Sequence, residues 1–159
     1  MAIQAGDKAP DIKTPEFKLA DHRGRRVVLF FYPKSDTPGC TKEACGFRDA
    51  AKTFAKRDAV IVGVSPDKAA AQQKFATKYS LPFPLVPDPE HAIAEAYGVW
   101  VEKSMYGRKY MGIERSTFVV DEKGKVAHVF QKVKPEGHAA EVLEALADGP
   151  NENRMKQRS

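Results

Sequence analysis

Two cysteines, Cys40 and Cys45, are the residues of this sequence whose type and spacing favour redox chemistry. Cys40 follows the turn-rich segment 33–39 and stands where a helix is expected to begin. The free backbone N–H groups of a first helical turn and the positive end of the helix dipole favour a thiolate over a thiol. Because the thiolate is the nucleophile, we predict that Cys40 is a reactive cysteine.

A thiolate alone reacts slowly with a peroxide, because the leaving oxygen takes up negative charge and the O–O bond must be held in line with the sulfur. Thr37 lies on the turn before Cys40, where its hydroxyl could accept a hydrogen bond from the thiol region or donate one to a bound oxygen. Arg115 precedes an expected strand over residues 117–120 and could supply a planar cation. These three residues together predict a thiol peroxidase.

The segments that carry these residues resemble the peroxiredoxins, and within them the bacterioferritin comigratory protein or PrxQ group. The resemblance runs over about residues 3–147 and is strongest in Phe31-Tyr32-Pro33, in Thr37 to Cys45 and in Arg115-Ser116-Thr117-Phe118. It implies that Cys40 is the peroxidatic cysteine and that Thr37 and Arg115 hold the peroxide and the thiolate. It also implies that Pro33 shields the site from water and that Glu43 orients the arginine.

The same resemblance implies the substrates and the partners. The enzyme would reduce hydrogen peroxide and organic hydroperoxides, would take its electrons from thioredoxin, and would carry no metal or prosthetic group. A second hypothesis uses the same thiolate: a peroxide sensor or redox-regulated holdase, in which oxidation of Cys40 changes the shape of the protein. The two differ in turnover, because a sensor stops after one oxidation.

Cys45 is expected to be the resolving cysteine, which captures the sulfenic acid on Cys40 before peroxide oxidises it irreversibly. On one regular helix the two Cα atoms would lie about 8.6 Å apart, whereas a disulfide needs less than about 7 Å. We therefore expect residues 40–47 to unwind locally before the bond forms. The alternative is that Cys45 is a small hydrophobic residue of the core in a one-cysteine enzyme.

The cysteine spacing also argues against a thioredoxin-like disulfide reductase. A CxxC pair exchanges within one folded state, but here the spacing is CxxxxC. Ser116 stands where the resemblance places a proline in thioredoxins.

The composition is that of a single small domain. The chain has 159 residues, of which 42% are hydrophobic, which is enough for one core. We expect one domain over residues 1–148 and a disordered basic tail over 149–159. The protein is expected to be cytoplasmic and without membrane contact, because the sequence has neither a signal peptide nor a long apolar run. It is also expected to be a monomer. The charge of +5 is spread over a highly charged chain, so no nucleic-acid partner is expected; binding through the tail is the less favoured alternative.

The hydrophobic pattern places these residues in an α/β fold. After an N-terminal extension of about 25 residues, the order predicts a thioredoxin-like fold, with a central mixed β-sheet flanked by α-helices. The expected elements are strands 27–32 and 59–65, a helix over 41–56, a helix from a Ser65 N-cap to about Tyr79, a short edge strand within 81–89, a brief helix over 90–97, a hairpin of strands 117–120 and 126–130, and a last helix from Pro135 to Gly149.

The remaining histidines and aromatic residues are assigned no chemistry. The histidines show no zinc-ligand spacing, and each is expected at the surface. Three aromatic residues are expected to form the wall of a core or an apolar rim near the active site. The histidines are His22, His91, His128 and His138, and the aromatic residues are Trp100, Tyr106 and Tyr110.

Overall fold

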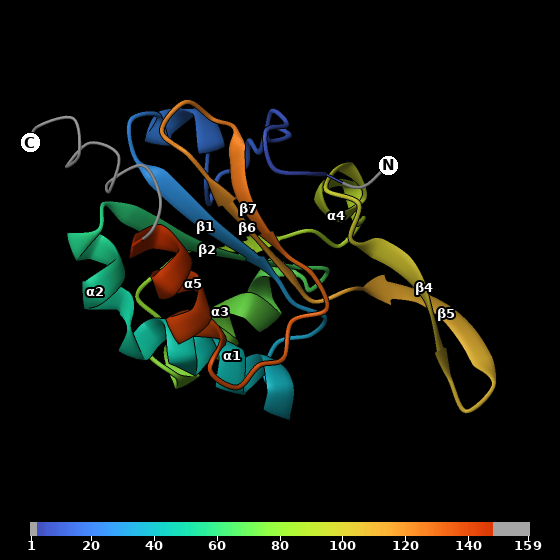
Figure 1. Cartoon of the computed structure of the whole chain (residues 1–159). Helices are drawn as coiled ribbons and strands as arrows, with labels where there is room; N and C mark the ends of the chain where they lie inside the picture. Colours follow the sequence, from blue (N-terminus) through green and yellow to red (C-terminus); the bar gives the residue numbers. More distant parts are fainter. Residues whose placement is uncertain (1–2, 148–159) are drawn as a thin grey trace, which may run out of the picture.

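The structure, a computed structural model, describes residues 3–147, which form an α/β fold around a central mixed sheet (Figure 1). Five strands lie in the order β3-β2-β1-β6-β7. Strands β3, β2 and β1 are parallel to one another, and β6 is antiparallel to both β1 and β7. The expected fold class is confirmed. The strands are β1 (Arg26–Phe31), β2 (Ala59–Ser65), β3 (Leu85–Pro87), β6 (Ser116–Val120) and β7 (Val126–Phe130).

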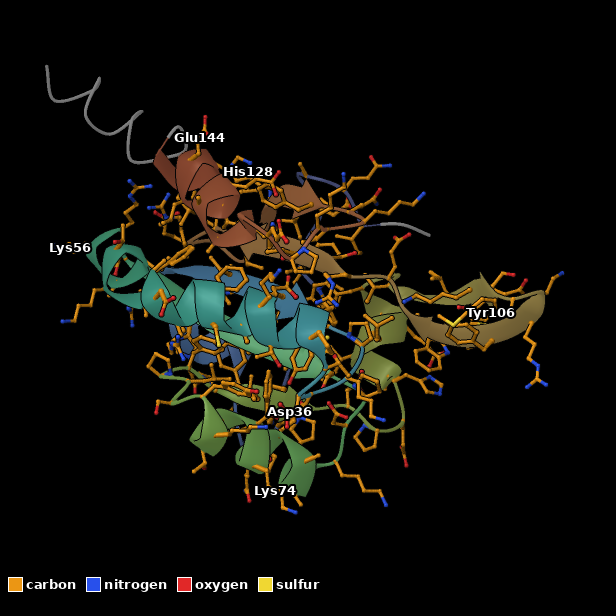
Figure 2. The ribbon with its side chains drawn as sticks, turned by 90° about the horizontal axis from the view of Figure 1, so that it is seen from below. Asp36, Lys56, Lys74, Tyr106, His128 and Glu144 are labelled. Carbon is orange, nitrogen blue, oxygen red and sulfur yellow. The ribbon has the colours of Figure 1, made fainter. Side chains whose placement is uncertain are left out.

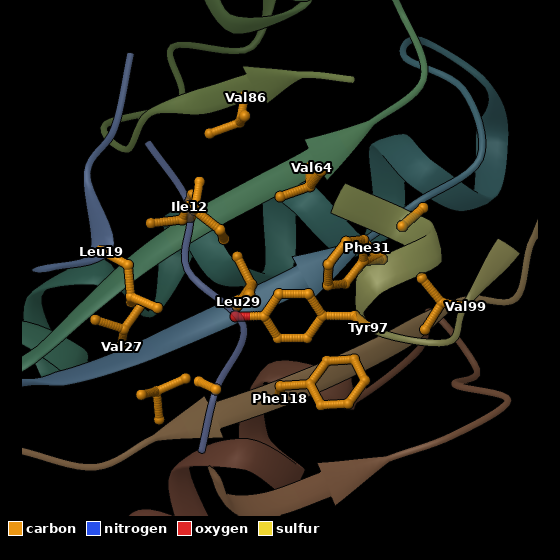
Figure 3. Packing of buried hydrophobic residues seen from close by; sticks show 14 of the residues in the cluster. Ile12, Leu19, Val27, Leu29, Phe31, Val64, Val86, Tyr97, Val99 and Phe118 are labelled. Carbon is orange, nitrogen blue, oxygen red and sulfur yellow. The ribbon is translucent and has the colours of Figure 1, made fainter. Parts of the chain in front are cut away.

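The central strand β1 is buried along its whole length, as its continuous apolar sequence predicts. Its side chains alternate between the two faces of the sheet. Val27, Leu29 and Phe31 belong to one hydrophobic cluster, which Figure 3 shows, whereas Val28 and Phe30 belong to a second cluster on the other face. Cys40 packs in this second cluster.

Helices cover both faces of the sheet (Figure 1). The face with the second cluster is covered by α1 (Pro38–Asp49), α2 (Ala51–Lys56), α3 (Ala69–Lys78) and α5 (His138–Ala147). The opposite face is covered by α4 (Ala92–Ala96) and by the N-terminal extension with its short 3-10 helix η1 (Leu19–His22). The extension contributes Ile12, Phe17 and Leu19 to the core of that face.

The predicted helix over 41–56 is two helices. The helix α1 begins earlier, at Pro38, and ends at Asp49, and α2 starts after Ala50. Proline is favoured at the first helical position, because its missing N–H would have no partner there. Both helices still bury one aromatic residue against the sheet, Phe47 from α1 and Phe54 from α2.

The helix expected to start from a Ser65 N-cap begins later than predicted. Ser65 ends β2, and α3 starts only at Ala69. The Ser65 hydroxyl donates to Asp67 and accepts a hydrogen bond from the amide of Gln72, so it is bonded to side chains instead of capping the helix. The last helix also begins late, at His138, and the predicted basic tail over 149–159 lies outside the described residues.

A hairpin of two strands, β4 (Trp100–Met105) and β5 (Arg108–Ile113), is absent from the sequence prediction. It projects from the body of the molecule as a separate two-stranded sheet (Figure 1). Its turn places Tyr106 at φ 53° and Gly107 at φ 77°, the two left-handed positions of a type I′ turn. Tyr106 is 96% exposed at the tip (Figure 2), so the expectation that it lines a core or a rim near the site is wrong.

The described residues contain neither a membrane-spanning helix nor a metal-binding cluster. No helix within residues 3–147 is long and apolar enough to cross a membrane. In the same part of the chain, no cluster of His, Cys, Asp and Glu side chains has the makeup of a metal site.

Candidate active site

The antiparallel pairing of β1 with β6 brings the segment that carries Cys40 close to Arg115. Phe31, at the end of β1, pairs with Ser116, at the start of β6. The chain leaves β1, turns, and enters α1 at Pro38, so Cys40 lies near this end of β1 and β6. Arg115 lies immediately before β6, and it therefore reaches the same edge although it is 75 residues away in the sequence.

Cys40 is in the first turn of α1, and it is only 1% exposed. The Nη2 atom of Arg115 donates a hydrogen bond to its sulfur over 3.2 Å. The sulfur is thus placed at a helix N-terminus and beside a guanidinium, and both favour negative charge on sulfur.

Glu43 holds the other side of the same guanidinium. Its Oε1 accepts a hydrogen bond of 2.6 Å from Arg115 Nη1. Burial raises the pKa of Glu43 to about 7, although the charge of Arg115 acts in the opposite direction. Its second oxygen, Oε2, has no hydrogen-bond partner among the described residues. Glu43 therefore fixes the position of Arg115. Burying its carboxylate charge costs free energy, because one of the two oxygens has no hydrogen-bond partner in the described part of the chain.

Arg115 is shared between two acidic groups. Burial works to lower its pKa, but the charges of Glu43 and Cys40 outweigh burial and raise it. The guanidinium therefore stays charged, and its planar fork donates to oxygen with one arm and to sulfur with the other.

Gly39 allows the arginine to come this close. A Cβ atom at this position would lie 3.3 Å from Arg115 Nη2 and 3.4 Å from Pro135 Cγ. The sequence contains the glycine next to Cys40, but only the fold reveals that Arg115 packs against it.

Thr37 is the N-cap residue of α1. Its hydroxyl donates a hydrogen bond of 2.8 Å to the carbonyl of Lys34, so the hydroxyl proton is already bonded within the turn before the helix. The oxygen retains acceptor capacity. Pro33 lies half-buried in the same turn, directly after Tyr32. The structure thus brings Cys40, Glu43 and Arg115 into direct contact and places Thr37 and Pro33 in the turn that leads to Cys40.

A polar network under this turn was not predicted from the sequence. The Tyr32 hydroxyl and the Ser35 hydroxyl are 3.0 Å apart, and the backbone N–H of Ser35 donates to Asp67. Burial raises the pKa of Tyr32 to about 12, so its phenol stays neutral. Asp36 adopts the left-handed conformation, at φ 61°, and accepts hydrogen bonds from two residues at the end of α3, Lys78 and Tyr79. These bonds fix the turn that carries Thr37.

Cys45 lies on the same helix as Cys40 and is half-buried, and both thiols are free. Along a regular helix their Cα atoms are separated by about 8.6 Å. The intact α1 therefore keeps the two sulfurs too far apart for a disulfide.

His138 departs from the expectation that each histidine lies at the surface. It is 2% exposed, beneath α1, where its ring meets the edges of Phe47 and Phe130. Its two ring nitrogens lie 2.7 Å from the Thr117 hydroxyl and 2.8 Å from Glu141. Burial lowers its pKa.

Comparisons with known proteins agree over most of the chain. A family model described as the AhpC/TSA family matches residues 5–129. The chain is 50% identical over 153 residues to peroxiredoxin Bcp of Bacillus subtilis, covering 93% of this chain and 98% of that protein. It is 41% identical over 151 residues to peroxiredoxin Bcp of Escherichia coli K12, covering 92% and 97%.

Solved structures show the same fold. The bacterioferritin comigratory protein of Xanthomonas campestris, described for its alkyl peroxide reduction activity, superposes with a TM-score of 0.79 at 43% identity, covering 82% of this chain and 83% of that one. A PrxQ mutant of Xylella fastidiosa superposes with a TM-score of 0.84 at 31% identity, covering 92% and 97%.

Proposed function

Because the chain belongs to the AhpC/TSA family and, within it, to the Bcp/PrxQ peroxiredoxins, we propose that its peroxidase reaction takes place at Cys40. The observation that carries this proposal is the 3.2 Å contact between Arg115 Nη2 and Cys40 Sγ at the start of α1. The substrates are hydrogen peroxide and organic hydroperoxides.

The first step is nucleophilic attack. The Cys40 thiolate attacks the terminal oxygen of the hydroperoxide, so an S–O bond forms as the O–O bond breaks. The oxygen that leaves carries the electron pair of that bond and takes a proton from solvent to become water or an alcohol. Cys40 is left as a sulfenic acid. Arg115 stabilises the charge that moves from sulfur to the leaving oxygen.

Thr37 and Pro33 act on the bound peroxide. The proton of the Thr37 hydroxyl is engaged by Lys34, which leaves its oxygen to accept a hydrogen bond from the O–H of the hydroperoxide. Such a bond orients the terminal oxygen toward the sulfur. Pro33 excludes water from that side, since it lacks an N–H that would bind it.

Cys45 resolves the sulfenic acid. Its thiol attacks Cys40 sulfur, a Cys40–Cys45 disulfide forms, and water leaves. The bond requires the first turns of α1 to unwind, because the intact helix separates the residues by about 8.6 Å. Thioredoxin then reduces the Cys40–Cys45 disulfide through its own pair of thiols, which are oxidised to a disulfide in the exchange.

The experiment is a coupled assay in which thioredoxin, its reductase and NADPH regenerate the protein. Wild type should consume many equivalents of NADPH with hydrogen peroxide and with an alkyl hydroperoxide. Cys40→Ser should show no turnover, and Cys45→Ser should react with one equivalent of peroxide and then stop. Wild type that also stopped after one equivalent would contradict the peroxidase cycle and favour a peroxide sensor. Normal turnover by Cys45→Ser would remove Cys45 from the mechanism.

A further inference from the structure

One face of the β4–β5 hairpin carries a lysine that is partly withdrawn from solvent. Lys103 pairs with Tyr110 across the two strands. Its neighbours Glu102 and Ser104 point to the other face and are exposed, whereas Lys103 is half-buried. A lone lysine on a projecting hairpin would ordinarily extend into water. Its partial burial indicates that the side chain lies against other residues instead of extending into water.

The stem of Lys103 runs toward the active site. A Cβ atom at Gly112 would lie 3.4 Å from Lys103 Cδ and 3.4 Å from the Tyr110 ring. The aliphatic stem therefore passes over Gly112, beside the Tyr110 ring. Gly112 is the diagonal neighbour of Lys103 on β5, on the side that leads to Arg115. The stem is thus directed along β5 on the side that leads to Arg115.

The charges that act on Lys103 are those of the active site. Burial and the charge of Arg115 lower its pKa, whereas the charges of Cys40 and Glu114 act in the opposite direction. The ammonium is therefore within electrostatic reach of the sulfur. Two cations, Lys103 on the hairpin and Arg115 just before β6, thus lie within electrostatic reach of the same sulfur.

We propose that Lys103 is a positioning residue of the peroxidase site, whose ammonium group acts through Cys40 by stabilising the negative charge on its sulfur before attack. This inference rests on the proposed function. No electron or proton passes to Lys103: the S–O bond forms, the O–O bond breaks, and the leaving oxygen takes its proton from solvent. Lys103 contributes a field that falls with screening by salt, because the side chain is only partly buried.

The test compares Lys103→Met with Lys103→Arg. The methionine keeps an unbranched apolar stem of similar shape and removes the charge, while the arginine keeps the charge. Lys109→Met is the matched control, since Lys109 lies on the other face of the hairpin, where it is exposed and 3.8 Å from Glu102. Cys40→Ser is measured beside them, because any reactivity that it retained would contradict the proposed function and not the role of Lys103.

The first measurement is the rate of oxidation by one equivalent of hydrogen peroxide, in stopped flow at low and high salt. The second is the rate of alkylation by iodoacetamide from pH 5 to 9, which reports the thiolate without peroxide. Glu43, with its pKa of about 7, titrates within this range, so the profiles are compared between variants that all retain it. Arg115 and the phenol of Tyr32, with its pKa of about 12, keep one protonation state throughout.

Lys103→Met is expected to lower the peroxide rate by about five- to tenfold at low salt and to move the alkylation profile to higher pH. Lys103→Arg should restore most of the rate, and Lys109→Met should match wild type. The proposal is overturned if Lys103→Met matches wild type in both measurements. It is also overturned if Lys103→Arg is as slow as Lys103→Met with an unchanged alkylation profile, because the lysine would then only pack against Gly112 and Tyr110 within the hairpin.

Discussion

Gly39 leaves room for Arg115, since a Cβ atom on this glycine would lie only 3.3 Å from Arg115 Nη2. The guanidinium lies over the bare Cα of Gly39 with Pro135 on the same side. Because Glu43 and Cys40 hold both arms of the guanidinium, the far end of this side chain has little freedom to move away.

Gly39→Ala should therefore slow the reaction without destabilising the fold. The added Cβ would press on Arg115 Nη2 from 3.3 Å and displace it by a few tenths of an ångström. We expect the rate of peroxide oxidation to fall by about three- to tenfold, while the helix gains up to about 1 kcal/mol from the replacement of a glycine. Stopped-flow oxidation and thermal unfolding measure the two effects.

The matched control is Gly46→Ala, in the same helix. A Cβ there would lie 3.8 Å from the side chain of Ala139, an ordinary contact distance. This variant should gain helix stability and keep the wild-type rate. Equal rates for the two alanine variants would show that Gly39 does not set the position of Arg115.

Glu43→Gln should change stability and rate in opposite directions. The pKa of Glu43 rises from 4.5 to about 7 in the folded state, so the folded protein binds this proton more tightly than the unfolded chain does. The contribution of Glu43 to stability therefore falls as pH rises through that window. The glutamine removes this loss, so the variant should be more stable than wild type at pH 8, on the order of 2 kcal/mol, and alike at pH 4. Its oxidation rate should fall, because a neutral amide holds Arg115 less firmly.

Denaturant unfolding at pH 4, 6 and 8 tests this prediction. Glu136→Gln is the control, because Glu136 forms an exposed pair with Lys42 and such pairs contribute little. A Glu43→Gln protein that was less stable than wild type at pH 8 would show that the ion pair with Arg115 outweighs the cost of burying the charge.

His138→Gln should reduce the loss of unfolding free energy that His138 causes at acidic pH. Burial lowers the pKa of His138, and the nearby charge of Arg115 acts in the same direction while Glu141 opposes it. The unfolded chain therefore binds the proton first, so the contribution of His138 to wild-type stability falls as pH drops below about 6.5. The glutamine has no such proton, although it loses the ring contacts with Phe47 and Phe130.

The measurement is the free energy of unfolding at pH 7.5, 6.5 and 5.5. The variant should be less stable than wild type at pH 7.5, and the difference should shrink at each lower pH. A constant difference would mean that His138 acts only through packing.

Formation of the disulfide should open the first part of α1. Hydrogen exchange of the protein oxidised with one equivalent of peroxide should show loss of protection over residues 40–47, since the intact helix keeps the sulfurs too far apart. The helix α3 serves as an internal reference and should exchange as in the reduced protein. Retained protection over 40–47 in protein with a verified Cys40–Cys45 bond would contradict local unwinding.

Much of the fold is predictable from the sequence because its sheet is buried. The strands β1 and β2 are continuous apolar runs, and the prolines around Leu85 restrict β3 to a short edge strand. The hairpin β4–β5 escapes prediction because most of its side chains face solvent. Its turn also places a tyrosine, Tyr106, where asparagine or glycine is the usual signal.

The candidate site, like the fold, has residues that the sequence predicts and residues that it does not. Residue type and position single out Thr37 and Arg115, and the family resemblance adds Glu43. The structure brings Glu43 and Arg115 into contact with each other beside the sulfur. The parts that were missed depend on elements that meet only in space. The proposed contribution of Lys103 comes from the hairpin, and Asp36 is held by the end of α3.

The pairing of β1 with β6 also orders events during synthesis. Both cysteines leave the ribosome well before Arg115, and N-terminal segments emerge first. An unfinished chain therefore holds its thiols without the guanidinium that the proposed mechanism requires. Under the proposed mechanism, rapid reaction of Cys40 with peroxide therefore awaits the docking of β6 beside β1, when Cys45 is already present to resolve the sulfenic acid.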